Sequence, residues 1–232
     1  AQNQSGTATI TIFPTPSATL DGTTAVCVNA PQPTLTFTGA DGNAPYTFTY
    51  SINGGTAQTI STTTGNSVTL AAPTNAAGVF TYALQTVSDL NGSTCTQNST
   101  GTAIITVNPL PTATITGSTS VCLNATEPQI TFTGAGATAP YTFFYTINGG
   151  ATQSVTTTTG NSVTVSAPTP TAGTFTYVLQ SVKDASSTLC SQQQSGSVEI
   201  TIWPLPTSAY TTSSPVCQEG VISFTDQSVP NV

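Results

Sequence analysis

The five cysteines of this chain are spaced at a fixed interval. Cys27, Cys122 and Cys217 are separated by steps of 95 residues, and Cys95 and Cys190 are separated by the same step. Because two independent sets of cysteines share one spacing, the chain is predicted to be a tandem array with a 95-residue period. A unit of this size buries enough surface to fold as one small domain.

Other segments recur at the same spacing without insertions. The Ala-Pro-Tyr-Thr-Phe of residues 44–48 returns at 139–143, and the Asn-Gly-Gly of residues 53–55 returns at 148–150. Two copies of one unit are therefore expected to share one fold.

Within each copy, apolar and polar residues alternate as they do in half-buried β-strands. Tyr46, Phe48 and Tyr50 alternate with threonines, and residues 102–107 alternate in the same way. The Asn-Gly-Gly at 53–55 tolerates positive φ and predicts a hairpin turn. About seven short strands per copy without helical periodicity predict an all-β fold of tandem immunoglobulin-like β-sandwich repeats with a 95-residue period, arranged end to end.

The charge composition excludes several functions. The chain has one lysine or arginine, eight acidic residues and no histidine, which gives a net charge of −7 at pH 7. Nucleic-acid binding needs clustered cations, so no nucleic-acid partner is expected. Ser-His and Cys-His catalytic relays need histidine, so neither an enzyme nor a cofactor is expected. Charged side chains make up only 4% of the residues, so the surface is predicted to carry mainly hydroxyl and amide groups.

The cysteines are interpreted as disulfides rather than as zinc ligands or buried free thiols, because histidine and close Cys-x-x-Cys pairs are absent from the sequence. Cys27 follows the first expected strand and Cys95 follows the sixth, which is expected to place both at one end of the sandwich. Equal 68-residue spacings predict the disulfides Cys27–Cys95 and Cys122–Cys190. Cys217 is expected to have its partner beyond residue 232.

Two acidic residues occupy matching positions in the two copies, Asp89 and Asp184. The acidic residues are interpreted as solvated loop carboxylates, and these two also suit turns in which the side chain bonds to the backbone. Calcium needs clustered oxygen ligands, and the sequence around the junctions between copies has no acidic cluster. Phe144 is the aromatic residue of the two copies that is expected to face outward.

Alternating prolines mark the junctions between copies. Pro109 and Pro111 open the second copy, and Pro204 and Pro206 follow it. Proline fixes its own φ and favours extended geometry in the residue before it. The junctions are therefore predicted to be short polyproline-like spacers, and the array a semi-rigid rod.

Several of these motifs together resemble a known family. The Pro-x-Pro-Thr-Ala-Thr-Ile of residues 109–115, the Ser-Val-Cys-x-Asn of 120–124, the Ala-Pro-Tyr-Thr-Phe strand, the Asn-Gly-Gly turn and the late cysteine resemble repeats of very large bacterial gliding-motility adhesins. Those adhesins are exported by the type IX secretion system. The resemblance implies an extracellular filament on the bacterial cell surface. The implied partners are other repeats of the same long chain and an outer-membrane anchor or secretion machinery, with an unidentified surface or glycan ligand.

The repeat and the resemblance together predict four segments. They are residues 1–13, the last strand of a preceding repeat; 14–108 and 109–203, two immunoglobulin-like repeats; and 204–232, the start of a further repeat or of a polycystic-kidney-disease-type sandwich.

A structural shaft segment of an adhesin filament is the favoured function, and two alternatives stay open. One is a carbohydrate-binding or spacer array of a secreted hydrolase, which clustered exposed aromatic residues would favour. The other is a pilus subunit in which residues 1–13 are donated to a neighbour as a strand. Strand donation is the weaker alternative, because residues 102–107 and 197–202 already provide the last strand of each copy.

Overall fold

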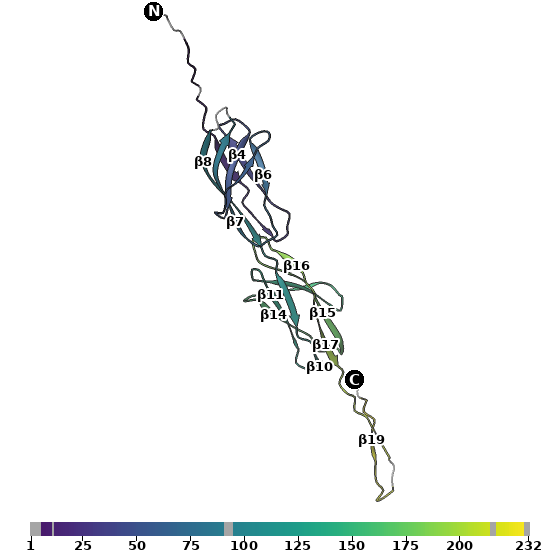
Figure 1. Cartoon of the computed structure of the whole chain (residues 1–232). Helices are drawn as coiled ribbons and strands as arrows, with labels where there is room; N and C mark the ends of the chain where they lie inside the picture. The colour runs from purple at the N-terminus through teal and green to yellow at the C-terminus, as the bar shows by residue number, and fades with distance from the viewer. Residues whose placement is uncertain (1–5, 11, 91–94, 214–216, 230–232) are drawn as a thin grey trace, which may run out of the picture. The chain divides into compact units, whose positions relative to one another are not determined.

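The computed structural model describes residues 6–10, 12–90, 95–213 and 217–229. The chain divides between Pro109 and Leu110 into two compact units. Figure 1 shows that both units are built from β-strands joined by turns.

Two sheets form the first unit, and their strands follow the apolar alternation of the sequence. The strands are β1 (Ser17–Asp21), β2 (Thr24–Cys27), β3 (Thr34–Ala40), β4 (Tyr46–Ile52), β5 (Gln58–Ser61), β6 (Ser67–Ala71), β7 (Gly78–Asp89) and β8 (Thr96–Asn108). One sheet has the order β1-β3-β6 and the other the order β2-β8-β7-β4-β5. Neighbouring strands are antiparallel except β2 and β8, which run parallel.

The second unit repeats this topology. Its strands are β9 (Thr112–Thr116), β10 (Thr119–Cys122), β11 (Gln129–Ala135), β12 (Thr142–Ile147), β13 (Gln153–Thr156), β14 (Ser162–Ser166), β15 (Gly173–Lys183), β16 (Ser191–Gln193) and β17 (Ser197–Trp203). The smaller sheet has the order β14-β11-β9. In the larger sheet, β10-β17-β15-β12-β13, β16 and β17 both pair with β15, as the single strand β8 pairs with β7.

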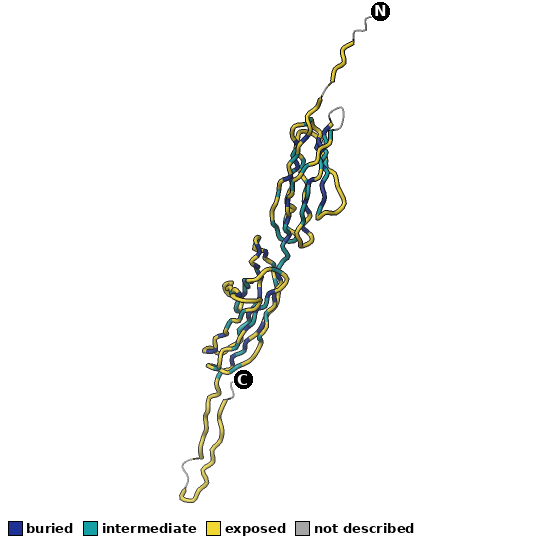
Figure 2. Tube along the Cα trace, turned by 90° about the vertical axis from the view of Figure 1, so that its left-hand side faces the viewer, coloured by how far each residue is buried: buried dark blue, intermediate teal, exposed yellow. Residues whose placement is uncertain are grey.

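Each unit has its own core between its two sheets. The fully buried side chains of the first core include Leu35, Phe37, Phe48, Val87 and Ile105. Those of the second core include the matching residues Ile130, Phe132, Phe143, Val182 and Ile200. Burying one such side chain contributes about 1.5–3 kcal/mol. The inward faces predicted for residues 46–50 and 102–107 are confirmed, and Figure 2 shows the alternation of buried and exposed positions along the strands.

The predicted hairpin turn is confirmed in both units. Asn53 and Gly54 have φ values of 51° and 70°, and the turn joins the antiparallel strands β4 and β5. The side chain of Asn53 also contacts a strand outside the hairpin. Its Oδ1 accepts a hydrogen bond of 2.7 Å from the N–H of Thr81 in β7. Asn148 makes the same 2.7 Å contact in the second unit. The turn therefore also attaches the hairpin to the neighbouring strand of its sheet.

A buried tyrosine anchors the loop that precedes β12. An added Cβ at Gly134 would lie 2.5 Å from Cγ of Tyr141, so the ring packs directly against the glycine. The Tyr141 hydroxyl donates to the carbonyl oxygen of Ala137 (2.6 Å) and accepts from its N–H (3.2 Å). The N–H of Tyr141 donates to Oγ1 of Thr157 (2.9 Å), which satisfies a buried backbone group. Tyr46 packs in the same way in the first unit.

Two segments lie outside the sandwiches. The described part of residues 1–13 forms no strand, and the side chains of Ile10 and Ile12 are 85% and 87% exposed. The assignment of residues 1–13 to a preceding repeat therefore stays a prediction. After the second sandwich, β18 (Tyr210–Thr212) pairs with β19 (Phe224–Asp226) as a separate two-stranded sheet with exposed side chains.

Candidate functional site

The two cysteines of the first unit lie at opposite ends of its sandwich. Cys27 ends β2 and stands opposite Asn108, the last residue of the parallel strand β8. Cys95 immediately precedes Thr96, the first residue of that 13-residue strand. At about 3.3 Å per residue, Cys27 and Cys95 are roughly 40 Å apart. A disulfide needs Cα atoms within about 7 Å of each other, so these two cysteines cannot bond in the folded unit.

The second unit has the same separation. Cys122 ends β10 opposite Trp203, the last residue of β17. The carbonyl oxygen of Cys190 accepts a hydrogen bond of 3.0 Å from the N–H of Asp184, directly after the other end of β15. The 11 residues of β15 run between the two ends, which separates Cys122 from Cys190 by roughly 35 Å.

The predicted disulfides Cys27–Cys95 and Cys122–Cys190 are therefore wrong. Cys27 and Cys190 are each disulfide-bonded, whereas Cys95, Cys122 and Cys217 have free thiols. The prediction placed both cysteines of a repeat at one end because Cys27 follows the first expected strand and Cys95 follows the sixth. A residue that follows one strand and a residue that precedes a parallel neighbour lie at opposite ends, and β2 and β8 are such a pair.

A glycine in the sequence signals the geometry that the prediction missed. Gly22 lies between β1 and β2 with a φ of 120°, and a Cβ there would lie 2.6 Å from the carbonyl oxygen of Thr34. At this point the chain leaves the smaller sheet and joins the larger one. Gly117 has the same role between β9 and β10, with a φ of 128°. The change of sheet without a change of direction makes the next short strand parallel to the last strand of the repeat.

A buried aspartate holds the loop that carries Cys190. Asp184 is 2% exposed, and its Oδ1 accepts a hydrogen bond of 2.9 Å from the hydroxyl of Ser186. The Ser186 Oγ in turn accepts a bond of 3.4 Å from the N–H of Cys190. The Thr188 hydroxyl lies 3.1 Å from the Cys190 sulfur. The loop thus fixes the position of a cysteine that is itself 1% exposed.

The matching residue Asp89 has a related role in the first unit. Its side chain is 3% exposed, and its Oδ2 accepts a hydrogen bond of 3.1 Å from the N–H of Asn43. Its own N–H donates to the carbonyl oxygen of Cys95 at 3.3 Å. The interpretation of Asp89 and Asp184 as solvated carboxylates is wrong. Both are buried, and hydrogen bonds offset part of the cost of removing the carboxylates from water.

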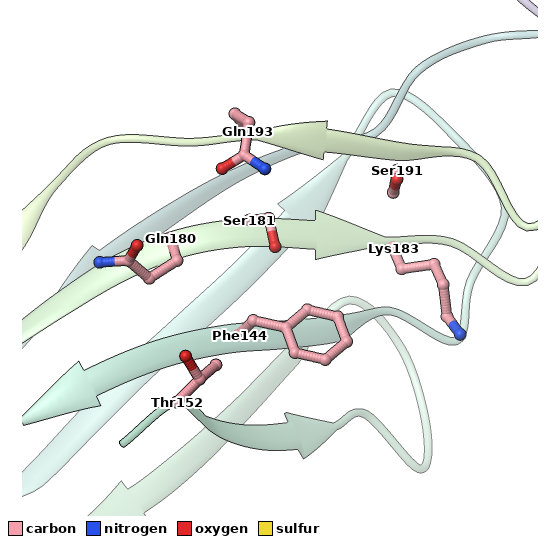
Figure 3. A pocket seen from close by; sticks show the side chains of 7 residues that line it. All are labelled: Phe144, Thr152, Gln180, Ser181, Lys183, Ser191 and Gln193. Carbon is pink, nitrogen blue, oxygen red and sulfur yellow. The ribbon is translucent and has the colours of Figure 1, made fainter. Parts of the chain in front are cut away.

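A shallow hollow of about 380 Å³ lies on the outer face of the larger sheet of the second unit (Figure 3). It is lined by Phe144, Thr152, Gln180, Ser181, Lys183, Ser191 and Gln193. Its floor is a row of paired residues across three strands, because Phe144 lies opposite Ser181 and Ser181 opposite Gln193. The prediction that Phe144 faces outward is confirmed.

The hollow combines groups that suit a hydroxylated ligand. An aromatic ring offers an apolar face, and amide, hydroxyl and ammonium groups offer hydrogen bonds. The first unit lacks this combination, because Thr49 and Ser88 stand at the positions of Phe144 and Lys183. A ligand that depends on the ring or the cation would therefore bind one unit and not the other.

The buried tyrosines of the two cores serve packing rather than proton transfer. Burial raises the pKa of Tyr50 and of Tyr145 above the ordinary value of 10.0. Burial raises the pKa of Tyr82 and of Tyr177 as well, and the charge that the neighbouring tyrosine would carry raises it further. All four phenols are therefore neutral at physiological pH.

Across the described ranges, no three His, Cys, Asp or Glu side chains gather into a possible metal site. The part of the chain that the structure describes also has no helix of the length and apolarity needed to cross a membrane.

Comparison with known proteins identifies the fold. No protein-family model matches the sequence, and no curated protein matches it. The I-band fragment I67–I69 of titin matches with a TM-score of 0.52 and 11% identity, over 95% of this chain and 77% of the fragment. The units have an immunoglobulin-like fold. The predicted all-β, immunoglobulin-like fold class is confirmed.

Bacterial adhesins are also among the similar structures. A Ca²⁺-stabilised adhesin that helps an Antarctic bacterium bind ice matches with a TM-score of 0.49 and 19% identity, over 85% of this chain. A 1.5-MDa bacterial ice-binding adhesin matches with a TM-score of 0.42 and 17% identity, over 81% of this chain. This chain spans 52% and 65% of those two structures.

Proposed function

We propose that this chain is a structural shaft segment of a secreted bacterial cell-surface adhesin filament. The observation that carries the proposal is what the two units have in common. Both keep the same core and the same internal hydrogen bonds, such as the 2.9 Å bonds from Tyr46 to Thr62 and from Tyr141 to Thr157. The aromatic ring and the cation of the hollow, Phe144 and Lys183, in contrast, occur in one unit only. A repeated scaffold with an unrepeated surface suits a spacer.

The disulfide-bonded cysteines support an extracellular location. Disulfides persist in oxidising compartments and are rare in the cytoplasm, and both Cys27 and Cys190 are bonded. The sequence resemblance to gliding-motility adhesins supports the finer proposal of export by type IX secretion and a role in adhesion or gliding. In that setting the partners are other repeats of the same chain and an outer-membrane anchor or the secretion machinery.

The proposal can be tested in the bacterium that produces the chain. Antibodies against the chain should label filaments on intact, unpermeabilised cells. Removal of one complete repeat in frame should shorten the filaments while the cells still attach to surfaces. Label confined to the cell interior, or complete loss of attachment when one repeat is removed, would contradict a shaft function.

Carbohydrate binding is the second candidate function, and the hollow at Phe144 favours it. The full chain should be titrated with a panel of soluble glycans beside the double variant Phe144→Thr with Lys183→Ser. These substitutions install the residues that the first unit has at the same positions, so the fold should tolerate them. A shaft predicts no saturable binding by either protein. Saturable binding by the wild type that the double variant loses would favour the carbohydrate-binding function.

The third candidate, strand donation, has less support in the structure. Residues 6–10 are exposed and form no strand, as an undocked donor segment would. However, β8 and β17 already provide the last strand of each unit, paired along β7 and β15. Each described sandwich therefore has its own strand at the place that a donated strand would occupy.

A further inference from the structure

We propose that β14 pairs edge to edge with β14 of a second copy of this chain. β14 lies at one end of the smaller sheet of the second unit, whose order is β14-β11-β9. It pairs with β11, and in the described part of the chain no strand pairs with its other side. An open edge of this kind presents unpaired N–H and C=O groups to which another strand can bond.

Two hydrogen bonds at the ends of β14 show which backbone groups face its open edge. The carbonyl oxygen of Asn161 accepts from the N–H of Gly134 at 2.8 Å, and the N–H of Ala167 donates to the carbonyl oxygen of Pro128 at 2.9 Å. Both bonds point toward β11 and its continuations. Successive residues of a strand point their N–H and C=O groups to opposite sides, so every second residue between Asn161 and Ala167 faces the open edge. Those residues are Ser162, Thr164 and Ser166.

β14 lacks the features that usually block an edge strand. Its sequence is Ser-Val-Thr-Val-Ser, with no charged residue and no proline, and its register with β11 has no bulge. Charged side chains, prolines and bulges are the devices by which proteins prevent pairing at an edge. The β-branched valines and threonine also favour the extended backbone that pairing needs.

The other edges of the second unit are less available. At the opposite edge of the same sheet, the side chain of Gln194 occupies β9, because its Oε1 accepts the N–H of Ala113 at 3.0 Å. The edge strands of the larger sheet, β10 and β13, have four residues each. By the same alternation, each of them directs the groups of only two residues outward. β14 therefore offers the longest free edge of the unit.

The edge of β14 is complementary to itself, which points to a second copy as the partner. When two copies pair antiparallel about a twofold axis at Thr164, this residue stands opposite Thr164 of the second copy. Ser162 then stands opposite Ser166 of the second copy, so all three outward-directed residues form hydrogen-bonded pairs. Hydroxyl side chains directly opposite each other also stabilise antiparallel strands.

The distribution of charge also favours contact between copies at this sheet. The net charge of −7 makes two copies of the chain repel each other on average. However, β9, β11 and β14 contain no charged residue. The smaller sheet of the second unit can therefore approach its own copy without placing like charges opposite each other.

The same edge recurs in the first unit. β6 ends the sheet β1-β3-β6, as β14 ends its own sheet. The carbonyl oxygen of Asn66 accepts from the N–H of Gly39 at 2.8 Å, and the N–H of Ala72 donates to the carbonyl oxygen of Pro33 at 2.9 Å. The outward-directed residues are therefore Ser67, Thr69 and Ala71. Each repeat thus carries one open edge of the same kind.

Pairing at these edges deepens the proposed shaft function and rests on it. A single contact between two five-residue strands is small and should be weak. A long array presents one edge per repeat, and many linked contacts act together at a high effective concentration. Neighbouring shafts would then associate laterally into bundles, although each isolated repeat binds its copy only weakly.

Analytical ultracentrifugation of the full chain tests the association. Its free thiols are alkylated first, so that no disulfide can join two copies. The wild type should associate reversibly as its concentration rises. The double variant Thr69→Lys with Thr164→Lys should raise the Kd at least about tenfold, because each lysine would stand opposite the same lysine of the second copy.

The matched control is Thr19→Lys with Thr116→Lys. It adds the same two charges at exposed positions of β1 and β9, the opposite edges of the same two sheets. The control should associate as the wild type does. A wild type that stays monomeric up to about 1 mM, or equal association by the wild type and the edge variant, would overturn the proposal.

Amide hydrogen exchange locates the contact. At low concentration the outward-directed amides of Ser162, Thr164 and Ser166 should exchange faster than those of Val163 and Val165, which face β11. At high concentration the three fast amides should become protected in the wild type but not in the edge variant. Association without this protection would place the contact elsewhere and overturn the proposal.

Two further outcomes separate this proposal from its alternatives. Concentration-dependent protection that also appears in residues 6–10 would show that this exposed segment pairs with β14, which would overturn pairing of β14 with itself. Failure of the antibodies to label surface filaments would contradict the shaft function but leave the pairing of the purified chain intact. A monomeric chain, in contrast, would remove the pairing and leave the shaft function standing.

Discussion

Thr157→Val should selectively destabilise the second unit. Thr157 is 3% exposed, and its Oγ1 accepts the N–H of Tyr141 at 2.9 Å. Valine keeps the shape of threonine but removes the acceptor, so a buried backbone N–H loses its partner. An unsatisfied buried donor costs about 1–3 kcal/mol. For a domain of this size, each kcal/mol lowers Tm by about 4–8 °C.

Differential scanning calorimetry of the full chain measures the effect. The transition of the second unit should move down by at least about 4 °C, while that of the first unit is unchanged. Thr62→Val removes the matching acceptor of Tyr46 and should move the other transition. Thr158→Val is the matched control, because Thr158 is exposed.

Amide hydrogen exchange provides a second readout. Loss of the acceptor should reduce the protection of the Tyr141 amide more than that of amides in the β12–β15 ladder. Equal Tm values for Thr157→Val and Thr158→Val would refute the reasoning, because they would show that the buried N–H finds another partner at no cost.

Three further predictions concern packing, pH and the junction. Gly134→Ala should destabilise the second unit by about 1–3 kcal/mol in chemical denaturation, since the added Cβ would lie 2.5 Å from the Tyr141 ring. Gly101→Ala is the control, because a Cβ at Gly101 would lie 3.6 Å from the nearest atom. Burial raises the pKa of Tyr177 above 10.0, so its contribution to stability is complete below pH 10 and is lost as the pH rises through the raised pKa. Absorbance at 295 nm and circular dichroism should therefore show ionisation and unfolding together above pH 10, and ionisation of all tyrosines in a folded protein would contradict this. Pro109→Gly removes a fixed φ from the junction, so it should make the reduced chain more compact in small-angle scattering with an unchanged melting temperature. Pro111 is buried and is therefore left in place. An unchanged scattering profile would count against a stiff junction.

Much of the local structure could be predicted from the sequence, because it depends on neighbouring residues. Alternation places Phe48 inward whatever the rest of the chain does, since side chains alternate along a strand. Asn53 and Gly54 form the hairpin turn because both tolerate positive φ. The two units show the same turn and the same tyrosine contacts because the same residues recur 95 positions later.

Burial of the aspartates could not be read from the sequence. Asp89 and Asp184 stand in loops, where a carboxylate is usually solvated. Their burial depends on a second loop: the N–H of Asn43, distant in sequence, contacts Asp89, and the Thr138 loop covers the segment after Asp184. Only the folded sandwich brings such loops together.

The cysteines show most clearly which properties the sequence determines and which the tertiary structure decides. The sequence alone determines that they repeat at one interval and that they favour an oxidising compartment. Their partners depend on strand direction, because β2 runs parallel to β8 and sends Cys27 to the far end from Cys95. Spacing along the chain does not show direction in space. A disulfide forms only between sulfur atoms that the fold holds a few ångströms apart, so only the tertiary structure decides which cysteines can bond.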